Sequence, residues 1–219
     1  MPNKRARPYK SAVRERQAGD TRRRIVAASR QLLRREGYAG MTIEAIARRA
    51  EVSVQNVYAI FKSKTGILAE LLDESAFGPD YERTVWRAMS AREPEARLRL
   101  AARIARQIHD AQSATFDLLR GAGVVAPELA KLERRRERLR YEREKVMILS
   151  LREAGWLRPG LDPRTARDIF WMLTGRDVYR MLVRERGWQA KKYQDWLAGA
   201  LVRSLLANRV ECRHRPSGS

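Results

Sequence analysis

The chain has few of the residue types from which disulfides, metal sites and catalytic triads are built. Its 219 residues include one cysteine, Cys212, and two histidines, His109 and His214. A single cysteine excludes an internal disulfide framework and a cysteine-built metal cluster. Two histidines leave little for a histidine metal site or a histidine-based triad. We therefore predict no metal, no cofactor and no catalytic residues, and we do not expect an enzyme.

Long apolar runs are also missing. No run approaches the ~20 residues of a membrane span, and one of the longest, from Val146 to Leu151, is interrupted by Ser150. The basic N-terminus is not followed by the apolar segment of a secretory signal. We therefore expect a cytoplasmic protein without a membrane partner. Hydrophobic residues still make up 44% of the chain, which is enough to build a core.

Acidic residues are too few to balance the bases. The 46 Lys and Arg residues against 26 Asp and Glu residues give a net charge of +20. Residues 1–64 hold 16 bases and 5 acids, a net of +11, so less than a third of the chain carries more than half of the excess. Positive charge concentrated in this way favours a polyanionic partner.

The segment from residue 20 to residue 66 has the pattern of short capped helices. Apolar residues recur at spacings of three and four from Ile25 to Leu33, and Gly37 stands where this helix should end. Thr42, Ser53 and Ser63 each precede a further helical pattern and are residue types that cap helices. A tight turn before Ser53 completes the pattern of a helix-turn-helix unit.

The remainder predicts a second domain that is also helical, so the fold class is all-α. No strand-like alternation persists, and helices are expected over 81–91, 94–111, 115–121, 128–154, 165–186 and 188–208. The expected parts are a flexible basic arm (1–19), the helix-turn-helix domain (20–66), the helical domain (67–208) and a flexible tail (209–219). The arm either follows DNA phosphates or an A·T-rich minor groove, or is a solvated tail that adds only general attraction.

A short helix fits the major groove of DNA, and its first residues reach the base edges. Here these residues are Val54, Gln55 and Asn56, and Gln or Asn paired with adenine contributes about 1–3 kcal/mol of base discrimination. Residues at helix ends can hold phosphates, which adds Thr42, Ser53, Tyr58, Lys62 and Lys64. The simpler alternative is that Thr42 and Ser53 only cap helices and that Tyr58 only packs.

The ordered motifs of this block are Glu36-Gly37-Tyr38, Thr42-Ile43-x-x-Ile46-Ala47, Ala50-x-Val52-Ser53, Val57-Tyr58-x-x-Phe61 and Ser63-Lys64. With them the sequence resembles the TetR (tetracycline-repressor) family of transcriptional regulators. The resemblance implies phosphate contacts at Thr42, Tyr58 and Lys64. Two residues depart from the family pattern. Glu51 stands where the family often has glycine, and Asn56 replaces a common threonine. A positive φ at Glu51 would cost about 1 kcal/mol, so we expect a slightly different turn.

The resemblance further implies a homodimeric, ligand-responsive repressor of a palindromic DNA site, nucleoid-associated in a bacterium when bound to DNA. Its last helices would pair across the dimer through Ile169, Phe170, Leu173, Tyr193, Trp196, Leu197, Ala200, Leu201 and Leu205. A small-molecule effector of unknown identity would contact Trp86, His109, Phe116 and Trp171. Packing within one subunit is the alternative for both sets. An architectural, nucleoid-type DNA-binding protein and a helical enzyme are the alternative functions.

The segment 131–145 is dense in charge. Pairs such as Glu137 with Arg140 and Arg140 with Glu144 stand three or four residues apart and can support a solvent-exposed helix. Leu132, Leu139 and Val146 recur every seven residues and predict the inward edge of that helix.

Overall fold

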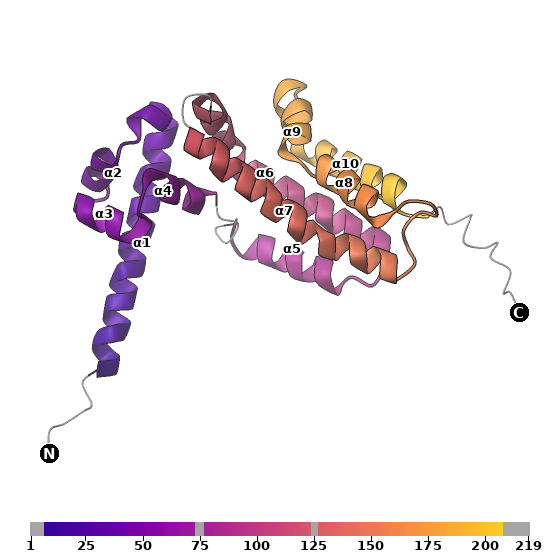
Figure 1. The fold of residues 1–219 in the computed structure, drawn as a ribbon, viewed down its shortest axis with the longest axis horizontal. Helices are drawn as coiled ribbons and strands as arrows, with labels where there is room; N and C mark the ends of the chain where they lie inside the picture. The colour runs from indigo at the N-terminus through magenta and orange to yellow at the C-terminus, as the bar shows by residue number, and fades with distance from the viewer. Residues whose placement is uncertain (1–6, 73–76, 124–126, 208–219) are drawn as a thin grey trace, which may run out of the picture. The chain divides into compact units, whose positions relative to one another are not determined.

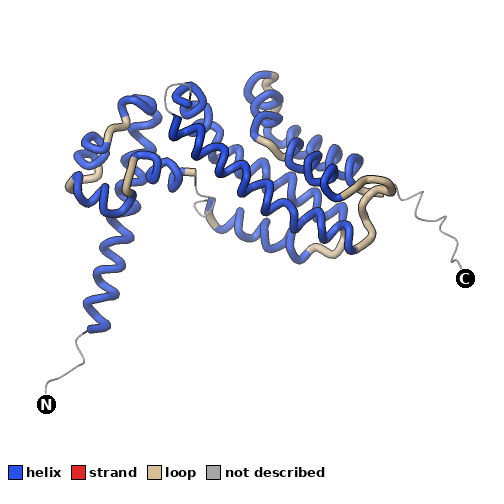
Figure 2. The backbone as a smooth tube through the Cα atoms, viewed as in Figure 1, coloured by secondary structure: helices blue, strands red, loops and turns tan. Residues whose placement is uncertain are grey.

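The computed structural model describes the backbone of residues 7–72, 77–123 and 127–207, and the side chains of these residues apart from 7–15, 113–114 and 116–123. The described parts consist of helices joined by loops, with one isolated bridge between Leu157 and Leu206 as their only strand-like feature (Figure 2). The predicted all-α class is confirmed.

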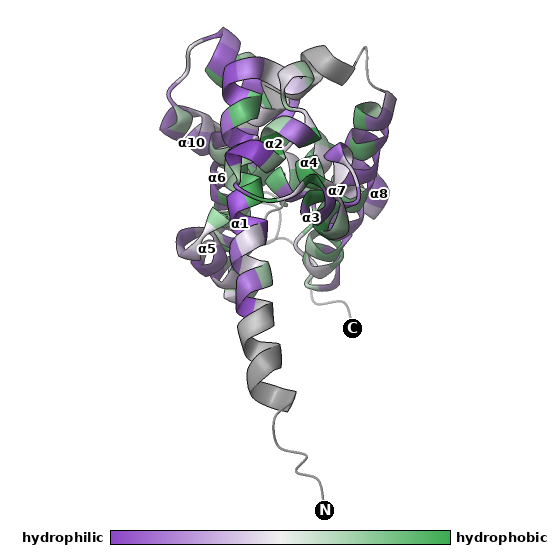
Figure 3. Ribbon diagram, turned by 90° about the vertical axis from the view of Figure 1, so that its left-hand side faces the viewer, coloured by the Kyte–Doolittle hydropathy of each residue, from purple (hydrophilic) through white to green (hydrophobic). Residues whose placement is uncertain are grey.

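The first compact unit comprises residues up to 73 together with 114–132. Its helices are α1 (Arg7–Gly40), α2 (Ile43–Arg49), α3 (Val54–Phe61) and α4 (Lys64–Leu71), coloured indigo to purple in Figure 1. Hydrophilic and hydrophobic residues alternate along the coloured part of α1, and α3 carries a hydrophobic stretch (Figure 3). The apolar faces meet in one core that includes Ile25, Leu33, Met41, Ile46, Val57, Phe61, Ile67, Leu68 and Leu129.

Helix α1 differs from the prediction at its start. It begins at Arg7, so residues 7–19, predicted to be part of a flexible arm, are helical. The prediction relied on apolar periodicity, whereas Arg, Ala, Glu and Gln in this segment favour helix by intrinsic propensity. At the other end the prediction is confirmed, because Gly37 has a φ of +70° that interrupts the helical conformation.

The second unit comprises residues 74–113 and 133 onward. Its helices are α5 (Pro79–Ser90), α6 (Pro94–Gly123), α7 (Pro127–Glu153), α8 (Pro163–Leu173), α9 (Arg176–Tyr179), a π-helical segment η2 (Arg180–Glu185) and α10 (Ala190–Leu205). Helices α6 and α7 extend beyond it, since 114–123 and 127–132 belong to the first unit. Helix α10 packs on α8. The core gathers Leu98, Ala102, Ile148, Leu151, Phe170, Tyr193, Leu197 and Leu201.

Three predictions for this unit are wrong in detail. Helix α6 runs without a break where two helices were expected, because residues 112–120 contain neither proline nor glycine. The expected helix 165–186 is divided after Thr174, where Gly175 caps the next helix. Leu139 and Val146 are 46% and 72% exposed and do not form an inward edge. None of the described helices is long and apolar enough to span a bilayer.

Candidate nucleic-acid interface

Hydroxyl side chains cap the N-terminal ends of α2, α3 and α4 in the first unit. The Oγ1 of Thr42 accepts a hydrogen bond from the N–H of Ala45 at 3.1 Å, and the Oγ of Ser53 accepts from the N–H of Asn56 at 3.1 Å. Ser63 does the same for α4 through Gly66. All three residues therefore cap helices, and contact of Thr42 and Ser53 with DNA phosphates stays a prediction. The other backbone N–H groups in each first turn remain oriented outward along the helix axis, where anions bind.

Helix α3 has two distinct faces. Val57 and Phe61 are buried in the core, whereas Gln55, Asn56 and Tyr58 are exposed, Tyr58 by 47%. Val54 is half-buried and packs against the core, so it presents less surface than the sequence suggested. The amide side chains proposed to read bases therefore lie on the free face of a helix whose other face is fixed by packing.

The turn between α2 and α3 is closed by backbone hydrogen bonds. Val52 N–H donates to the carbonyl of Ala47 at 3.0 Å, and Glu51 takes a φ of +54°. The expected departure to a different turn is thus wrong, since Glu51 adopts the left-handed conformation that the family usually gives to glycine. That conformation costs a residue with a Cβ about 1–2 kcal/mol.

Lys62 and Lys64 are both engaged with backbone. Lys62 ends α3 with a φ of +65°, and its Nζ donates to the carbonyl of Ala59 at 3.0 Å. The Nζ of Lys64 donates to the carbonyl of Tyr38 and lies 3.8 Å from the centroid of the Tyr38 ring. Both ammonium groups therefore lie at the start or end of a helix, as predicted, with their positions fixed by local partners.

A contact that sequence reasoning missed ties α1 to α4. Arg22 donates to both carboxylate oxygens of Glu70, at 2.9 and 2.7 Å, and its guanidinium lies 5.0 Å from the centre of the Phe61 ring. Arg22 and Glu70 stand 48 positions apart in the sequence, so no local sequence pattern predicts this ion pair. The contact holds α4 and the end of α3 against the long helix.

Two of the four residues predicted to contact an effector have a neighbour in common: the carbonyl of Thr174 accepts from His109, and Arg140 bonds both Thr174 and the carbonyl of Trp171. Trp86 is 69% exposed on α5, and the side chain of Phe116 lies outside the described residues. Trp171 is 36% exposed on α8, whereas His109 is buried on α6. The Nε2 of His109 donates to the carbonyl of Thr174 at 3.0 Å, and burial lowers the pKa of His109 to about 4. His109 is thus a neutral interior side chain.

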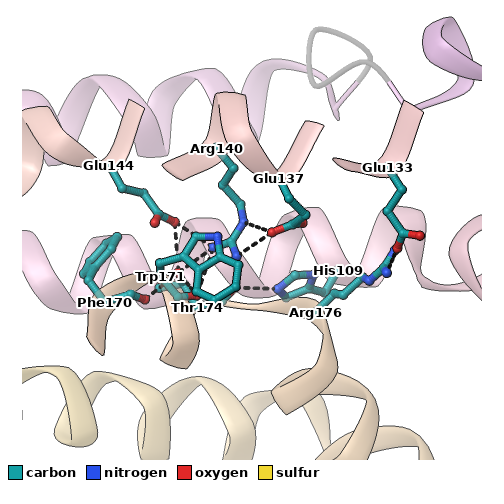
Figure 4. Close-up of polar contacts among 9 residues, drawn as sticks. All are labelled: His109, Glu133, Glu137, Arg140, Glu144, Phe170, Trp171, Thr174 and Arg176. Atoms are coloured by element: carbon teal, nitrogen blue, oxygen red, sulfur yellow. Dashed lines mark hydrogen bonds and ion pairs between the residues drawn. The ribbon is translucent and has the colours of Figure 1, made fainter. Parts of the chain in front are cut away.

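Beside His109 lies a half-buried ionic cluster centred on Arg140 (Figure 4). Its guanidinium donates to Glu137 and to Glu144, each at 2.8 Å, and also to Thr174 Oγ1 and the carbonyl of Trp171, each at 3.1 Å. The pairs expected to support a solvent-exposed helix therefore face α8 instead. The Oε2 of Glu144 has no hydrogen-bond partner, and burial raises the pKa of this carboxyl.

The residues predicted for a dimer interface lie largely in the core of the second unit. Tyr193, Leu197, Leu201 and Leu205 have no exposed surface, and Phe170 and Ala200 are buried. Ile169, Leu173 and Trp196 are half-buried. Most of the apolar stripe on α10 is thus covered by its own subunit.

Residues with metal-binding chemistry are scattered over the part of the chain that is described. Within it, no group of three or more His, Cys, Asp or Glu side chains is placed to hold a metal ion. Cys212 and His214 lie outside the described residues.

Comparison with known proteins finds a family model that matches the helix-turn-helix part of the chain. The family model "Bacterial regulatory proteins, tetR family" matches residues 25–71. The HTH-type transcriptional regulator Rv0767c of Mycobacterium tuberculosis is 37% identical over 65 residues, which are 29% of this chain and 30% of that protein. The match therefore spans less than a third of the relative.

Solved structures share the fold over most of the chain. NalD, the secondary repressor of the MexAB-OprM multidrug efflux pump in Pseudomonas aeruginosa, superposes with a TM-score of 0.63 at 20% identity, over 85% of this chain and 97% of that one. SmeT in its triclosan complex gives a TM-score of 0.67 at 18% identity, over 90% and 96%. Residues 25–71 of this chain are therefore similar to the N-terminal domain of bacterial regulatory proteins of the tetR family, and the fold is shared over most of the chain.

Proposed function

We propose that this protein is a sequence-specific DNA-binding transcriptional repressor that acts as a homodimer and releases DNA when a small molecule binds its second unit. The observation that carries the proposal is the free face of α3, on which Gln55, Asn56 and Tyr58 are exposed. The family of the N-terminal domain supports the same function. The excess of +11 over residues 1–64 supplies attraction to the phosphate backbone.

The test begins with selection of bound duplexes from a random pool. A palindromic consensus is expected, and binding to it should survive an excess of unrelated DNA, typically by a factor of about 10³ or more. Gln55→Ala and Asn56→Ala should each cost about 1–3 kcal/mol and relax the preference at one position of the site. Gln189→Ala serves as the matched control, because Gln189 is also exposed but lies in the second unit. Selection without a consensus would favour the architectural alternative, which the comparisons do not support.

The homodimer is proposed because two copies are needed to read two half-sites about 34–36 Å apart. Ile169, Leu173 and Trp196 retain exposed surface on α8 and α10, so these three residues are the better candidates for contact with a partner. Light scattering at concentrations that bind DNA should give twice the mass of one chain. The mass of a single chain would contradict this part of the proposal.

An effector site in the second unit is proposed around the Arg140 cluster, between Trp171 and His109. Two groups have unused hydrogen-bonding capacity: the Oε2 of Glu144 in the cluster, and the hydroxyl of the fully buried Tyr193. The ring of Tyr193 lies 5.0 Å from that of Tyr179, which in turn lies 5.1 Å from that of His109. A buried polar group without a partner costs about 1–3 kcal/mol, so a ligand that satisfies either one gains that amount. Small molecules that raise the unfolding temperature should also weaken DNA binding. Ligands that stabilise the protein without changing DNA affinity would indicate a constitutive regulator.

A further inference from the structure

The side chain of Lys64, at the start of α4, is held in place by contacts with Tyr38. Its Nζ donates to the backbone carbonyl of Tyr38 and lies over the ring of the same residue, with 3.8 Å between Nζ and the ring centroid. Burial lowers the pKa of Lys64, and the charge of Glu128 opposes that shift. Lys64 is only half-buried, so part of its side chain faces solvent. The ammonium is therefore held at a fixed place on the surface of the first unit.

The ring under Lys64 is itself held from a distant part of the chain. The hydroxyl of Tyr38 donates to Oε1 of Glu128 at 3.0 Å, across 90 positions of sequence. Glu128 lies in the first turn of α7, where the helix dipole favours a carboxylate. Burial, and then the hydrogen bond to Glu128, raise the pKa of Tyr38 to about 12, so the hydroxyl keeps its proton at neutral pH. Tyr38, Lys64 and Glu128 all belong to the first unit.

Glu128, Tyr38 and Lys64 contact one another in sequence, and each contact constrains the next side chain. Glu128 fixes the tilt of the Tyr38 ring, and the ring and the Tyr38 carbonyl together fix the ammonium. A free lysine side chain carries about 2 kcal/mol of rotamer entropy, part of which is lost when it binds a phosphate. A lysine already held in place loses less of this entropy on binding, so its phosphate contact is stronger.

We propose that Glu128 is a positioning residue for DNA binding, which acts through Tyr38 to hold Lys64 where a phosphate can reach it. The inference rests on the proposed function, because it takes Lys64 as a phosphate contact. It adds that the first turn of α7, a helix that otherwise belongs to the second unit, determines how this charge is presented.

The experiment uses the full-length protein and a duplex of random sequence, because phosphate contacts do not depend on sequence. Affinity is measured against salt for Lys64→Ala, Tyr38→Phe, Glu128→Ala and Glu128→Gln. Loss of one phosphate contact lowers the slope of log K against log salt by about 0.9, and Lys64→Ala defines that limit. Tyr38→Phe and Glu128→Ala should each lower the slope toward the Lys64→Ala value, and combining the two should add nothing.

Glu128→Gln is the matched control. It removes the same negative charge as Glu128→Ala but keeps an oxygen that accepts the Tyr38 hydrogen bond. A general charge effect would act equally in both variants, whereas positioning predicts that only Glu128→Ala lowers the slope. Equal slopes in Glu128→Ala and Glu128→Gln would overturn the proposal.

A second measurement needs no DNA. The Cε of Lys64 is bonded to Nζ, which lies 3.8 Å from the centroid of the Tyr38 ring, so the Cε protons should resonate upfield in the NMR spectrum of the free protein. Tyr38→Phe and Glu128→Ala should move that resonance toward its random-coil position, and Glu128→Gln should not. An unmoved resonance in Glu128→Ala would refute the positioning role even if the wild-type protein binds DNA. A wild-type protein that binds no duplex would refute the proposed function instead, and the positioning role with it.

Discussion

Replacing Glu51 by glycine should stabilise the helix-turn-helix. Glu51 has a φ of +54°, close to the centre of the left-handed region, where a Cβ crowds the following carbonyl oxygen at a cost of about 1–2 kcal/mol. Glycine avoids this cost but loses more backbone entropy on folding, about 0.5–1 kcal/mol. The expected net gain is therefore at most about 1.5 kcal/mol, and it should be confined to the part of the chain that contains α2 and α3.

Amide hydrogen exchange measures this gain where it arises. A gain of about 1 kcal/mol slows exchange through local opening by a factor of about five. The effect should appear at amides that close the turn, such as Val52 N–H, and not at amides of α10. Glu51→Ala is the matched control, since it removes the same side chain but keeps a Cβ at positive φ. Equal exchange rates in the glycine and alanine variants would refute the claim that backbone strain is the cause.

Two further predictions concern the second unit. His109 has a pKa of about 4 because it is buried, below its unfolded value of about 6.5, so the folded state resists protonation. Its contribution to stability should be complete above pH 6.5 and decline as pH falls toward 4, by about 3 kcal/mol in all. Urea unfolding at several pH values should therefore show a weaker pH dependence in His109→Gln, and an unchanged dependence would contradict the assignment. Leu201 is fully buried within one chain, so Leu201→Ala should lower the free energy of unfolding by about 2–5 kcal/mol. Val146→Ala, at a 72% exposed position, should change it by less than about 0.5 kcal/mol. If the effect of Leu201→Ala were small and depended on protein concentration, Leu201 would contact a second copy of the chain instead of the core of its own subunit.

The sequence predicts well what short-range rules decide. Thr42, Ser53 and Ser63 cap helices because a hydroxyl reaches a backbone N–H three residues ahead, and each of these bonds is present. The break at Gly37 follows from the same kind of local rule. Val57 and Phe61 stand four residues apart and are buried in the core of the first unit, so the opposite face of α3 is exposed.

What the sequence could not predict depends on distant contacts. Arg140 forms the expected pairs with Glu137 and Glu144, but Thr174 from another helix draws the same guanidinium inward. The hydrogen bond from Tyr38 to Glu128 joins residues that no spacing rule connects. The stripe on α10 was correctly expected to be buried, but periodicity alone does not say whether a partner or the same chain covers it.

The division into two units also separates the tryptophans from the helix-turn-helix. All five tryptophans, Trp86, Trp156, Trp171, Trp188 and Trp196, belong to the second unit, and the first unit has none. Tryptophan emission therefore observes the proposed effector-binding part alone, and any spectral change on mixing with DNA has to originate there. A tryptophan introduced at the exposed Tyr58 would give the other unit a signal of its own. The difference in emission between this variant and the wild-type protein would then report on the first unit, and the wild-type emission on the second.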